Sequence, residues 1–418
     1  MSSEESPDHS VTRRALMRGG AAAAVGTLAA PYVIGQARAA DTIKIGMVDP
    51  FTGTLAVLGH YELVGATMAV EDLNKRNGIL GRQVELISED TQANVGVAVQ
   101  KMNKLIDRDN CDLLMGTVAS NVSQALAQVC SQKKKLLMVT GGHVDDITGK
   151  NCAWNVFRVC NTTFTIAAAT TSAMLKRSGK RWYFMVPDYS FGHALHANMV
   201  AALQSLGGTE LGYSLKPLGS TDFSAELIKC KAADPQVVAV MMAGDDQISL
   251  LKQAAQFGLT KSIPFVVPLS ELEVIAALPP AEQVGFWNFE WYWDQPDVPQ
   301  TAAFTKAFQA HEPGKVPTAR AYFGYVGVHA LALAAEKAKT LENVRVGEAL
   351  SGLELPPEVA LQPNRHYFDP KTHQFVGGDF PASIKEGATY PKLAEIVSYE
   401  YATALQAPGV VCKMESSA

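Results

Sequence analysis

Short apolar runs and amphipathic segments alternate along most of the chain, and this alternation restricts its possible folds more than any other feature. Apolar runs such as 42–50, 111–116, 182–186 and 236–244 are each followed by a segment with apolar residues at helical spacing. One such unit occupies roughly 25–30 residues, which is typical of right-handed βαβ units and parallel sheets. Most of the runs are continuously apolar, as strands are when helices cover both faces of a sheet.

The number of predicted strands is too large for one compact sheet. We therefore expect an α/β protein with two parallel sheets, each with its own core. In open α/β sheets, ligands bind beyond the carboxyl ends of the strands, on the loops that begin the helices. If the ends of two sheets face each other across a cleft, the protein can close on a ligand about a hinge.

The first 40 residues differ from the rest, and we interpret residues 1–40 as a twin-arginine-type signal peptide. Arg13 and Arg14 precede a weakly apolar run, 19–34, that ends in small residues. This pattern fits an export signal, and the run is too short and glycine-rich to span a bilayer. A buried amphipathic helix is the alternative, but the run has no polar face. We expect the functional residues to begin near Asp41 and the protein to work in the periplasm.

Composition and charge restrict the partners. The chain has 418 residues, of which 47% are hydrophobic and 18% charged, and its formal net charge is −5. These values are typical of a soluble protein with a full core. The mildly acidic balance, without a basic stripe, argues against nucleic acid as a partner.

The cysteines form no CxxC pair, which argues against zinc-ribbon and thioredoxin-like sites. The six are Cys111, Cys130, Cys152, Cys160, Cys230 and Cys412. Outside the cytoplasm disulfides are permitted, and the spacing allows local bridges between Cys152 and Cys160 or between Cys111 and Cys130. The alternative is that most of these cysteines are small buried apolar residues.

The motifs of common catalytic and cofactor sites are missing from the sequence. In the segment DYSFG, Asp188 stands where a nucleophile elbow has its first glycine. Neither a phosphate-binding GxxxxGK[ST] motif nor a GxGxxG motif is present. His193 and His196 are close together on a predicted helix, but two histidines alone are a weak metal signal. We therefore expect no cofactor, no metal and no enzymatic activity; an exported two-domain hydrolase is the alternative.

The segment GHYELVGATMAVEDLNKRNGILGRQVELISEDTQ resembles the leucine/isoleucine/valine-binding protein family, the type I solute-binding proteins of ABC importers. The similarity continues through LLMGTVASNVSQAL, DYSFGHA and AGDDQISLLKQAAQFGL, and it extends to RHYFDPKTHQF near the end. Single matched positions are Gly53, Gly59, Gly65, Ala66, Asn74, Asn77–Arg82 and Asp90. The order and spacing of these segments carry the resemblance, because no one motif is decisive.

The resemblance implies two Rossmann-like lobes joined by a three-strand hinge, as in a Venus-flytrap periplasmic binding protein. The expected crossings between lobes are Cys160–Thr165, Phe286–Gln295 and Leu341–Gly352. The expected lobes are 41–160 plus 288–345, and 161–287 plus 346–418. The family also implies a small-molecule ligand, and a membrane permease and an ATPase as partners of a monomer. A ligand-sensing receptor subunit is the alternative among binding proteins.

Two loops of the first lobe are expected to hold the ligand. Ser120 and Asn121 lie between an apolar strand and a helix, where family members bind the ligand's carboxylate. Independently of the family, free N–H groups at a helix N-terminus attract an anion. Thr140, Gly142 and His143 follow the next strand, where a glycine lets the backbone approach a ligand. Helix capping by Ser120 and a plain glycine turn are the structural alternatives.

Further site positions follow from the family alignment. Leu58 stands where members often have an aromatic lid residue, and Tyr189 and Phe191 are expected to form an aromatic wall in the second lobe. Asp245 and Asp246 begin a helix after an apolar strand. They either cap that helix or recognise an amine or hydroxyl group of the ligand.

Glu271 bears on the class of ligand. Amino-acid binders of the family have a glutamate that binds the ligand's ammonium, just after the strand that aligns with PFVVP. In this chain Leu269 occupies the position of that glutamate, and Glu271 follows two positions later. Because a buried ammonium without a counter-charge is unfavourable, a displaced Glu271 favours carboxylates without an α-amine, such as aromatic acids. If Asp188, Asp245 or Glu271 reaches the ligand, an amino acid remains open. The sequence thus predicts a receptor for a small organic carboxylate, either an aromatic acid or an amino acid.

Overall fold

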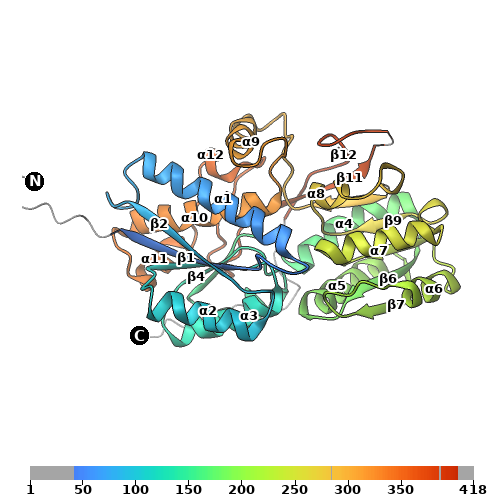
Figure 1. Cartoon of the computed structure of the whole chain (residues 1–418), viewed down its shortest axis with the longest axis horizontal. Coiled ribbons are helices and arrows are strands. Elements are labelled where there is room, and N and C mark those ends of the chain that lie inside the picture. The colour runs from blue at the N-terminus through green and yellow to red at the C-terminus, as the bar shows by residue number, and fades with distance from the viewer. Residues whose placement is uncertain (1–41, 284, 386, 403–418) are drawn as a thin grey trace, which may run out of the picture. The chain divides into compact units, whose positions relative to one another are not determined.

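The computed structural model describes residues 42–283, 285–385 and 387–402. The predicted signal peptide, residues 1–40, lies outside the described residues. The described part forms an α/β structure with two sheets, as the alternation of strands and helices predicted (Figure 1).

The first sheet has five parallel strands in the order β2-β1-β3-β4-β5. The strands are β1 Ile43–Asp49, β2 Val84–Asp90, β3 Leu113–Gly116, β4 Leu137–Val139 and β5 Val156–Arg158. Because β1 pairs with both β2 and β3, the direction of strand addition reverses between β1 and β3. Such a reversal leaves a crevice at the carboxyl ends of these strands, where open α/β sheets bind ligands.

The second sheet has eight strands in the order β12-β11-β10-β9-β8-β6-β7, with β13 paired to β11. The strands are β6 Arg181–Pro187, β7 Thr209–Lys216, β8 Val237–Val240, β9 Phe265–Val267, β10 Phe286–Phe289, β11 Gly378–Ile384, β12 Ala394–Ile396 and β13 Glu400–Tyr401. Strands β6 to β10 are parallel, whereas β11 runs antiparallel to β10, β12 and β13. The order reverses between β6 and β8, which places a second crevice at their carboxyl ends.

Helices cover both faces of each sheet (Figure 1). Helices α1 and α10 cover one face of the first sheet, and α2 and α3 cover the other. Helices α6 and α7 cover one face of the second sheet, and α4 and α5 cover the other. The α-helices are α1 Ala56–Lys75, α2 Val95–Asp107, α3 Ser120–Gln132, α4 Thr163–Ser178, α5 Ser190–Ser205, α6 Ser224–Ala232, α7 Gly244–Gln256, α8 Leu272–Ala276, α9 Gln300–His311, α10 Ala319–Ala338, α11 Asn343–Leu350 and α12 Pro357–Ala360. Short 3₁₀ turns are Asp145–Ile147, Leu259–Lys261 and Pro280–Glu282.

Capping side chains explain several helix starts. At the start of α2, Asn94 accepts a hydrogen bond from a backbone N–H of the first turn at 3.0 Å. Thr162 and Thr165 form a reciprocal capping box at the start of α4. Thr318 accepts a hydrogen bond from the N–H of Arg320 at 3.2 Å at the start of α10. These side chains satisfy N–H groups that have no partner inside the helix.

Helices α1 and α10 pack at close range because glycines face the contact. A Cβ atom at Gly65 would lie 1.8 Å from the carbonyl oxygen of Ala321. A Cβ atom at Gly324 would lie 2.0 Å from the carbonyl oxygen of Glu62. This close approach brings the first turns of α10 beside the middle of α1, and it decides which side chains surround Arg320.

The chain passes between the two sheets three times. The first crossing lies between β5 and α4. The second lies at Glu290, between the end of β10 and Trp291, which belongs to the core of the first sheet. The third lies between Phe375, also in that core, and Gly378, where β11 begins. The structure thus places the first two crossings near the positions expected from the sequence.

The third crossing differs from the expected position, Leu341–Gly352, and so does the boundary that assigned 346–418 to the second lobe. Apolar residues of α11, α12 and the segment after them pack in the core with α10; they are Val346, Leu350, Leu355, Val359, Leu361, Phe368 and Phe375. The segment also joins the first sheet through a bridge between Arg158 and Gln374. The first lobe therefore continues to about Phe375, because α11 buries its apolar side against α10 before the chain crosses.

The cysteines do not form either of the local bridges that the spacing allowed. Cys111, Cys130, Cys160 and Cys230 are free and buried, and Cys152 is disulfide-bonded. Burial raises the pKa of each of the four free thiols. They therefore stay protonated and act as small apolar core groups.

We predict that Gly65→Ala destabilises the protein by about 1–3 kcal/mol, because the added methyl group collides with the backbone of α10 and the helices must separate. The free energy of unfolding in urea measures this effect. Gly96→Ala is the control, since Gly96 is an exposed glycine in α2 and replacing it with a better helix former changes stability by at most about 1 kcal/mol. Equal stability of the two variants would contradict the close packing of α1 and α10.

Candidate functional site

The two lobes touch at the edge where the strand ends were expected to bind a ligand. The hydroxyl group of Thr54, just before α1, donates a hydrogen bond to Oδ1 of Asp246 in α7 at 2.8 Å. The N–H of Asp245 donates to the carbonyl oxygen of Thr54 at 3.1 Å. Gly244 makes this approach possible, because its φ is +58° and a Cβ atom there would lie 2.1 Å from the same oxygen. The structure is therefore a closed arrangement of the lobes.

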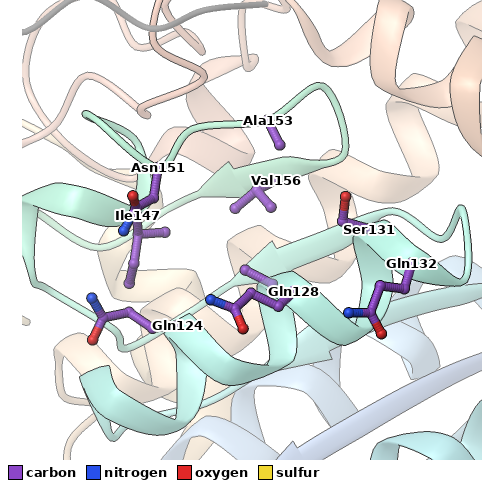
Figure 2. A pocket seen from close by; sticks show the side chains of 9 residues that line it. Gln124, Gln128, Ser131, Gln132, Ile147, Asn151, Ala153 and Val156 are labelled. Carbon is purple, nitrogen blue, oxygen red and sulfur yellow. The ribbon is translucent and has the colours of Figure 1, made fainter. Parts of the chain in front are cut away.

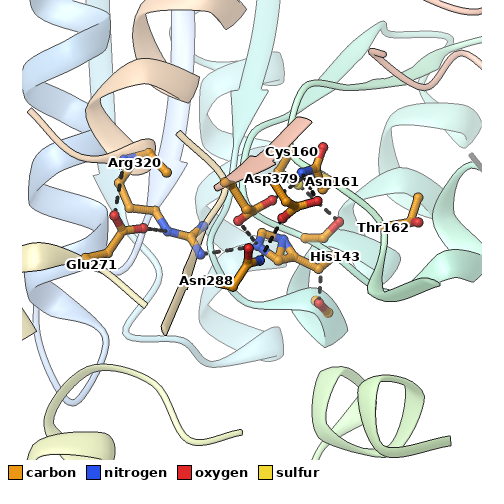
Figure 3. Close-up of polar contacts among 12 residues, drawn as sticks. His143, Cys160, Asn161, Thr162, Glu271, Asn288, Arg320 and Asp379 are labelled. Carbon is orange, nitrogen blue, oxygen red and sulfur yellow. Dashed lines mark hydrogen bonds and ion pairs between the residues drawn. The ribbon is translucent and has the colours of Figure 1, made fainter. Parts of the chain in front are cut away.

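Arg320, in the first turn of α10, is the centre of a buried charged cluster next to this contact (Figure 3). Its side chain is 3% exposed. Nη1 donates to Oε1 of Glu62 at 3.2 Å, and Nε lies 3.3 Å from Oε1 of Glu271. Nη2 lies 3.3 Å from Nε2 of His143. Burial by itself lowers the pKa of Arg320, but the nearby carboxyl groups, Glu62 first, outweigh burial and raise it.

Glu62 is the acidic partner of Arg320 in a buried ion pair. Its Oε2 accepts a hydrogen bond from the hydroxyl group of Thr140 at 2.5 Å. Asp49, at the end of β1, accepts from the N–H of Val118 at 2.9 Å. Burial raises the pKa of both carboxyl groups, and the neighbouring Glu62 raises that of Asp49 further. Of these two carboxyl groups, Glu62 is the one that pairs with Arg320, and this charge opposes the rise of its pKa.

Glu271 is the second carboxyl group beside Arg320. Its Oε2 accepts a hydrogen bond from the N–H of Ala319 at 3.1 Å, whereas Oε1 has no hydrogen-bond partner. Burial raises the pKa of Glu271 to about 8, although Arg320 acts in the opposite direction. In this arrangement Glu271 therefore carries a proton at neutral pH.

His143 joins Arg320 to Glu290. The imidazole Nε2 lies 2.8 Å from Oε2 of Glu290, and the ring packs edge-on to Phe191 with centroids 5.8 Å apart. Burial lowers the pKa of His143 and raises that of Glu290. Arg320 can only donate, and which imidazole nitrogen carries the proton depends on the tautomer. Nδ1 has no hydrogen-bond partner.

Glu290 connects this cluster to the three crossings. Its Oε1 accepts a hydrogen bond from the N–H of Asn161 in the first crossing at 2.8 Å. The side chains of Asn161 and Asn288 donate to the two oxygens of Asp379 in β11, at 3.0 and 2.8 Å (Figure 3). Burial raises the pKa of Asp379 to about 7. The crossings are therefore tied together by buried polar groups that also contact a residue of the candidate site.

The predicted site residues of the first lobe lie close together. Ser120 begins α3, and its Oγ accepts hydrogen bonds from the N–H groups of His143 and Val144 at 3.0 and 3.4 Å. Asn121 follows it, and its Oδ1 has no hydrogen-bond partner. A Cβ atom at Gly142 would lie 2.3 Å from the hydroxyl oxygen of Ser123, so only glycine lets this loop pack against α3. Thr140 and His143 belong to the Arg320 cluster.

The remaining predicted residues divide between the site and its surroundings. Phe191 is buried against His143, and Tyr189, just before α5, packs on Phe191 with centroids 5.9 Å apart. Glu271 reaches the Arg320 cluster. Leu58 is buried in the core between the first sheet and α3. Asp245 is exposed, and the buried residue at the lobe contact is its neighbour Asp246.

Sequence reasoning missed Arg320, Glu62 and Glu290. Arg320 is the single charged residue in TARAYFGYVGVHALALAA, and Glu62 interrupts an apolar stretch of its helix. A charged side chain within an apolar segment is rarely buried without a partner. Both positions therefore indicated a buried ion pair. Which groups form the partners could not be read from the sequence, because Glu62 and Arg320 are 258 residues apart.

Several buried polar atoms of this region lack hydrogen-bond partners. They are Oδ2 of Asp49, Oγ1 of Thr117, Oδ1 of Asn121, Nδ1 of His143, Oγ of Ser190, Oε1 of Glu271 and Nε of Arg320. Buried polar groups in proteins are normally satisfied. These seven atoms lie near the ends of strands of both sheets, and other buried atoms without a hydrogen-bond partner occur elsewhere in the described chain.

A separate pocket of about 310 Å³ lies between α3 and the segment 147–156 (Figure 2). It is lined mainly by Gln124, Gln128, Gln132 and Asn151, and it contains none of the predicted site residues. Its lining residues include no ionisable side chain, so it offers no counter-charge for a carboxylate.

In the described part of the chain, no group of three or more His, Cys, Asp or Glu residues is arranged to hold a metal ion. Between positions 42 and 402, leaving aside 284 and 386, no helix combines the length and the apolar character needed to cross a bilayer.

We predict that three buried carboxyl groups make a contribution to stability that is lost as the pH rises from about 4.5 to about 8. Burial raises the pKa values of Glu271, Glu273 and Asp379 to about 8, 7 and 7. At these groups the folded protein binds more protons than the unfolded chain in this interval, so the stability that they contribute at the acidic end is lost as the pH rises through these values. Burial lowers the pKa values of His329 and His373 to about 4, and these groups act in the opposite direction in the lower part of the interval. Melting temperatures across the interval measure the slope. Glu271→Gln should make the slope shallower, and an unchanged slope would contradict the assigned protonation.

Comparison with known proteins identifies the fold and the family. A family model described as periplasmic binding protein matches residues 42–388. The Leu/Ile/Val-binding protein homolog 3 of Brucella melitensis is 31% identical over 207 residues, which are 49% of this chain and 56% of that relative. The leucine-, isoleucine-, valine-, threonine-, and alanine-binding protein of Pseudomonas aeruginosa is 25% identical over 315 residues, 75% of this chain and 83% of the relative.

Solved structures show the same architecture. A periplasmic binding protein from Burkholderia mallei superimposes with a TM-score of 0.80 at 25% identity, covering 87% of this chain and 95% of that one. A solute-binding protein of an ABC transporter from R. palustris, in complex with benzoate, superimposes with a TM-score of 0.79 at 21% identity, covering 89% and 100%. The Venus-flytrap fold expected from the sequence is confirmed, and the hydrolase alternative is set aside. The chain belongs to the periplasmic binding protein family and is a solute-binding protein rather than an enzyme.

Proposed function

We propose that this protein is the periplasmic receptor of an ABC-type importer and that it binds a small organic carboxylate by closure of its two lobes. The observation that carries the proposal is the gathering of unpartnered buried polar atoms at the strand ends of both sheets. Relatives named for leucine, isoleucine and valine and a fold neighbour holding benzoate support a carboxylate as the ligand.

Closure is the mechanism that the contacts between the lobes support. The Thr54–Asp246 hydrogen bond exists only when the lobes are together, and Gly244 allows that approach. A ligand that touches groups of both lobes binds the closed state better than the open one and shifts the population toward it. The closed form would then present both lobes to a membrane permease and its ATPase.

Ser120 supports a carboxylate subsite at the start of α3. Its oxygen accepts hydrogen bonds from two backbone N–H groups, which leaves its own O–H free to donate to a ligand oxygen. The N-terminus of a helix also favours a negative charge. Asn121, next in the chain, adds an amide group whose Oδ1 is unpartnered.

Tyr189 and Phe191 support an apolar or aromatic body for the ligand. Both lie at the start of α5 in the second lobe, and Phe191 contacts His143 of the first lobe. Large rings that face a polar anchor are typical of small-molecule sites, in which a few polar groups orient a mostly apolar ligand. An aromatic acid and an amino acid with an apolar side chain both fit this description.

Export to the periplasm completes the proposal. The Arg13-Arg14 pair and the apolar run after it lie outside the described residues and motivate a twin-arginine-type route. Fusion of residues 1–45 to a reporter protein, with Arg13 and Arg14 both replaced by Lys as the control, tests this route.

Thermal-shift screening against amino acids and aromatic acids tests the ligand class. We expect at least one small carboxylate to raise the melting temperature, because a ligand at 100 times its Kd stabilises by about 2.7 kcal/mol. Calorimetric titration with Ser120→Ala should show binding weaker by roughly 1–3 kcal/mol, the contribution of a hydrogen bond to a charged group. A protein that no small carboxylate stabilises would disprove the proposed function.

The hydrogen bond between Thr54 and Asp246 leads to a second prediction about ligand affinity. Thr54→Val removes the hydrogen bond to Asp246 without changing the size of the side chain, so closure becomes less favourable and Kd rises roughly 3–10-fold. Thr67→Val is the matched control, because the hydroxyl group of Thr67 donates only within α1. If both variants bind as the unaltered protein does, the Thr54 contact does not contribute to the bound state.

A further inference from the structure

We infer that Arg320 binds the ligand's carboxylate directly, through the Nε and Nη2 edge of its guanidinium, and that Glu271 occupies the place beside this edge when no ligand is bound. The inference rests on the proposed function and changes one part of it, because it places the carboxylate at Arg320 instead of at Ser120. It assigns to the site a monocarboxylate with an apolar body and without an amine next to the carboxylate.

The local structure fixes the position of the Arg320 side chain. The residue lies in the first turn of α10, where Thr318 caps the helix and accepts from its N–H. Gly141 makes room for its side chain, because a Cβ atom there would lie 2.6 Å from Nη1 and 2.7 Å from Oε1 of Glu62. Any other residue at this position would collide with the Arg320–Glu62 pair.

The two edges of the guanidinium have different partners. On one side, Nη1 donates to Glu62 at 3.2 Å. On the other side, Nε has no hydrogen-bond partner, and Nη2 meets only the imidazole Nε2 of His143 at 3.3 Å (Figure 3). The Nε and Nη2 pair is a fork that binds both oxygens of one carboxylate. This fork is buried and lacks a carboxylate in hydrogen-bonding geometry.

Glu271 acts as an incomplete substitute for such a carboxylate. Its Oε1 approaches Nε to 3.3 Å, but the two atoms do not form a hydrogen bond. Its Oε2 is held instead by the N–H of Ala319. A free ligand is not tethered to the backbone in this way, so its two oxygens can align with Nε and Nη2 and replace the contact with Glu271.

The surroundings of the fork favour a ligand with an apolar body. His143, which touches Nη2, also packs against Phe191, and Phe191 packs against Tyr189. The wall formed by these rings therefore begins beside the fork. An α-ammonium group on the ligand would lie close to the fixed positive charge of Arg320, and like charges repel strongly in a buried site.

Matched ligand pairs test the inference on the full-length protein. The first pair is 3-phenylpropanoate and phenylalanine, and the second is 4-methylpentanoate and leucine, so that each pair differs only in the α-amine. We expect calorimetric titration to show that the amine-free member of at least one pair binds at least tenfold more tightly than its amino-acid partner.

Two substitutions separate the roles of Arg320 and Glu271. Arg320→Lys keeps the charge but loses the fork, and it should weaken binding of the amine-free acid at least tenfold. Glu271→Gln should strengthen that binding, because it removes the competing carboxyl group. Arg365→Lys is the control; Arg365 is 64% exposed and pairs with Glu354, and its replacement should not change the affinity.

The opposite result for Glu271→Gln would overturn the inference. If this variant loses binding and the amino acids are the preferred members of both pairs, Glu271 holds a ligand ammonium, and the proposed receptor function stands without the assignment of Arg320. Unchanged affinity in a folded Arg320→Lys variant also overturns it. If the unaltered protein binds no carboxylate at all, the proposed function fails together with the inference.

Discussion

The buried pair of Arg320 and Glu62 is the interaction on which the rest of the site depends. An isolated charge is very unfavourable inside a protein, and a buried ion pair is tolerated only when its geometry and its further hydrogen bonds are good. The pair meets this condition through Thr140, which donates to Glu62, and through Gly141, whose missing side chain leaves the necessary space. It thereby holds α1, α10 and the loop after β4 in one arrangement around the strand ends.

The same cluster reaches the crossings between the lobes. Nε2 of His143 lies within reach of both Arg320 and Glu290, and Glu290 accepts from Asn161 in the first crossing. The charged cluster is therefore connected to the crossings by buried polar contacts. Under the proposed function, a ligand bound beside this cluster would change the surroundings of a residue at the crossing.

The regular part of the fold was predictable because it depends on local patterns. Apolar strands and amphipathic helices alternate. Ser120, Thr140 and His143 follow the carboxyl ends of β3 and β4, where open α/β sheets bind ligands. The third crossing was not predictable in this way. The segment after Leu341 has the same amphipathic pattern whichever lobe it covers, and only its packing against α10 shows that the first lobe continues to about Phe375.

The sequence by itself determined the class of fold and the family, since each follows from residue patterns within short segments. The tertiary structure decided which charged groups meet at the candidate site. Glu62, His143, Glu271, Glu290 and Arg320 come from five separate parts of the chain, and their protonation depends on burial and on one another. Neither burial nor such neighbours are properties of a local sequence, because both arise only when distant segments pack together.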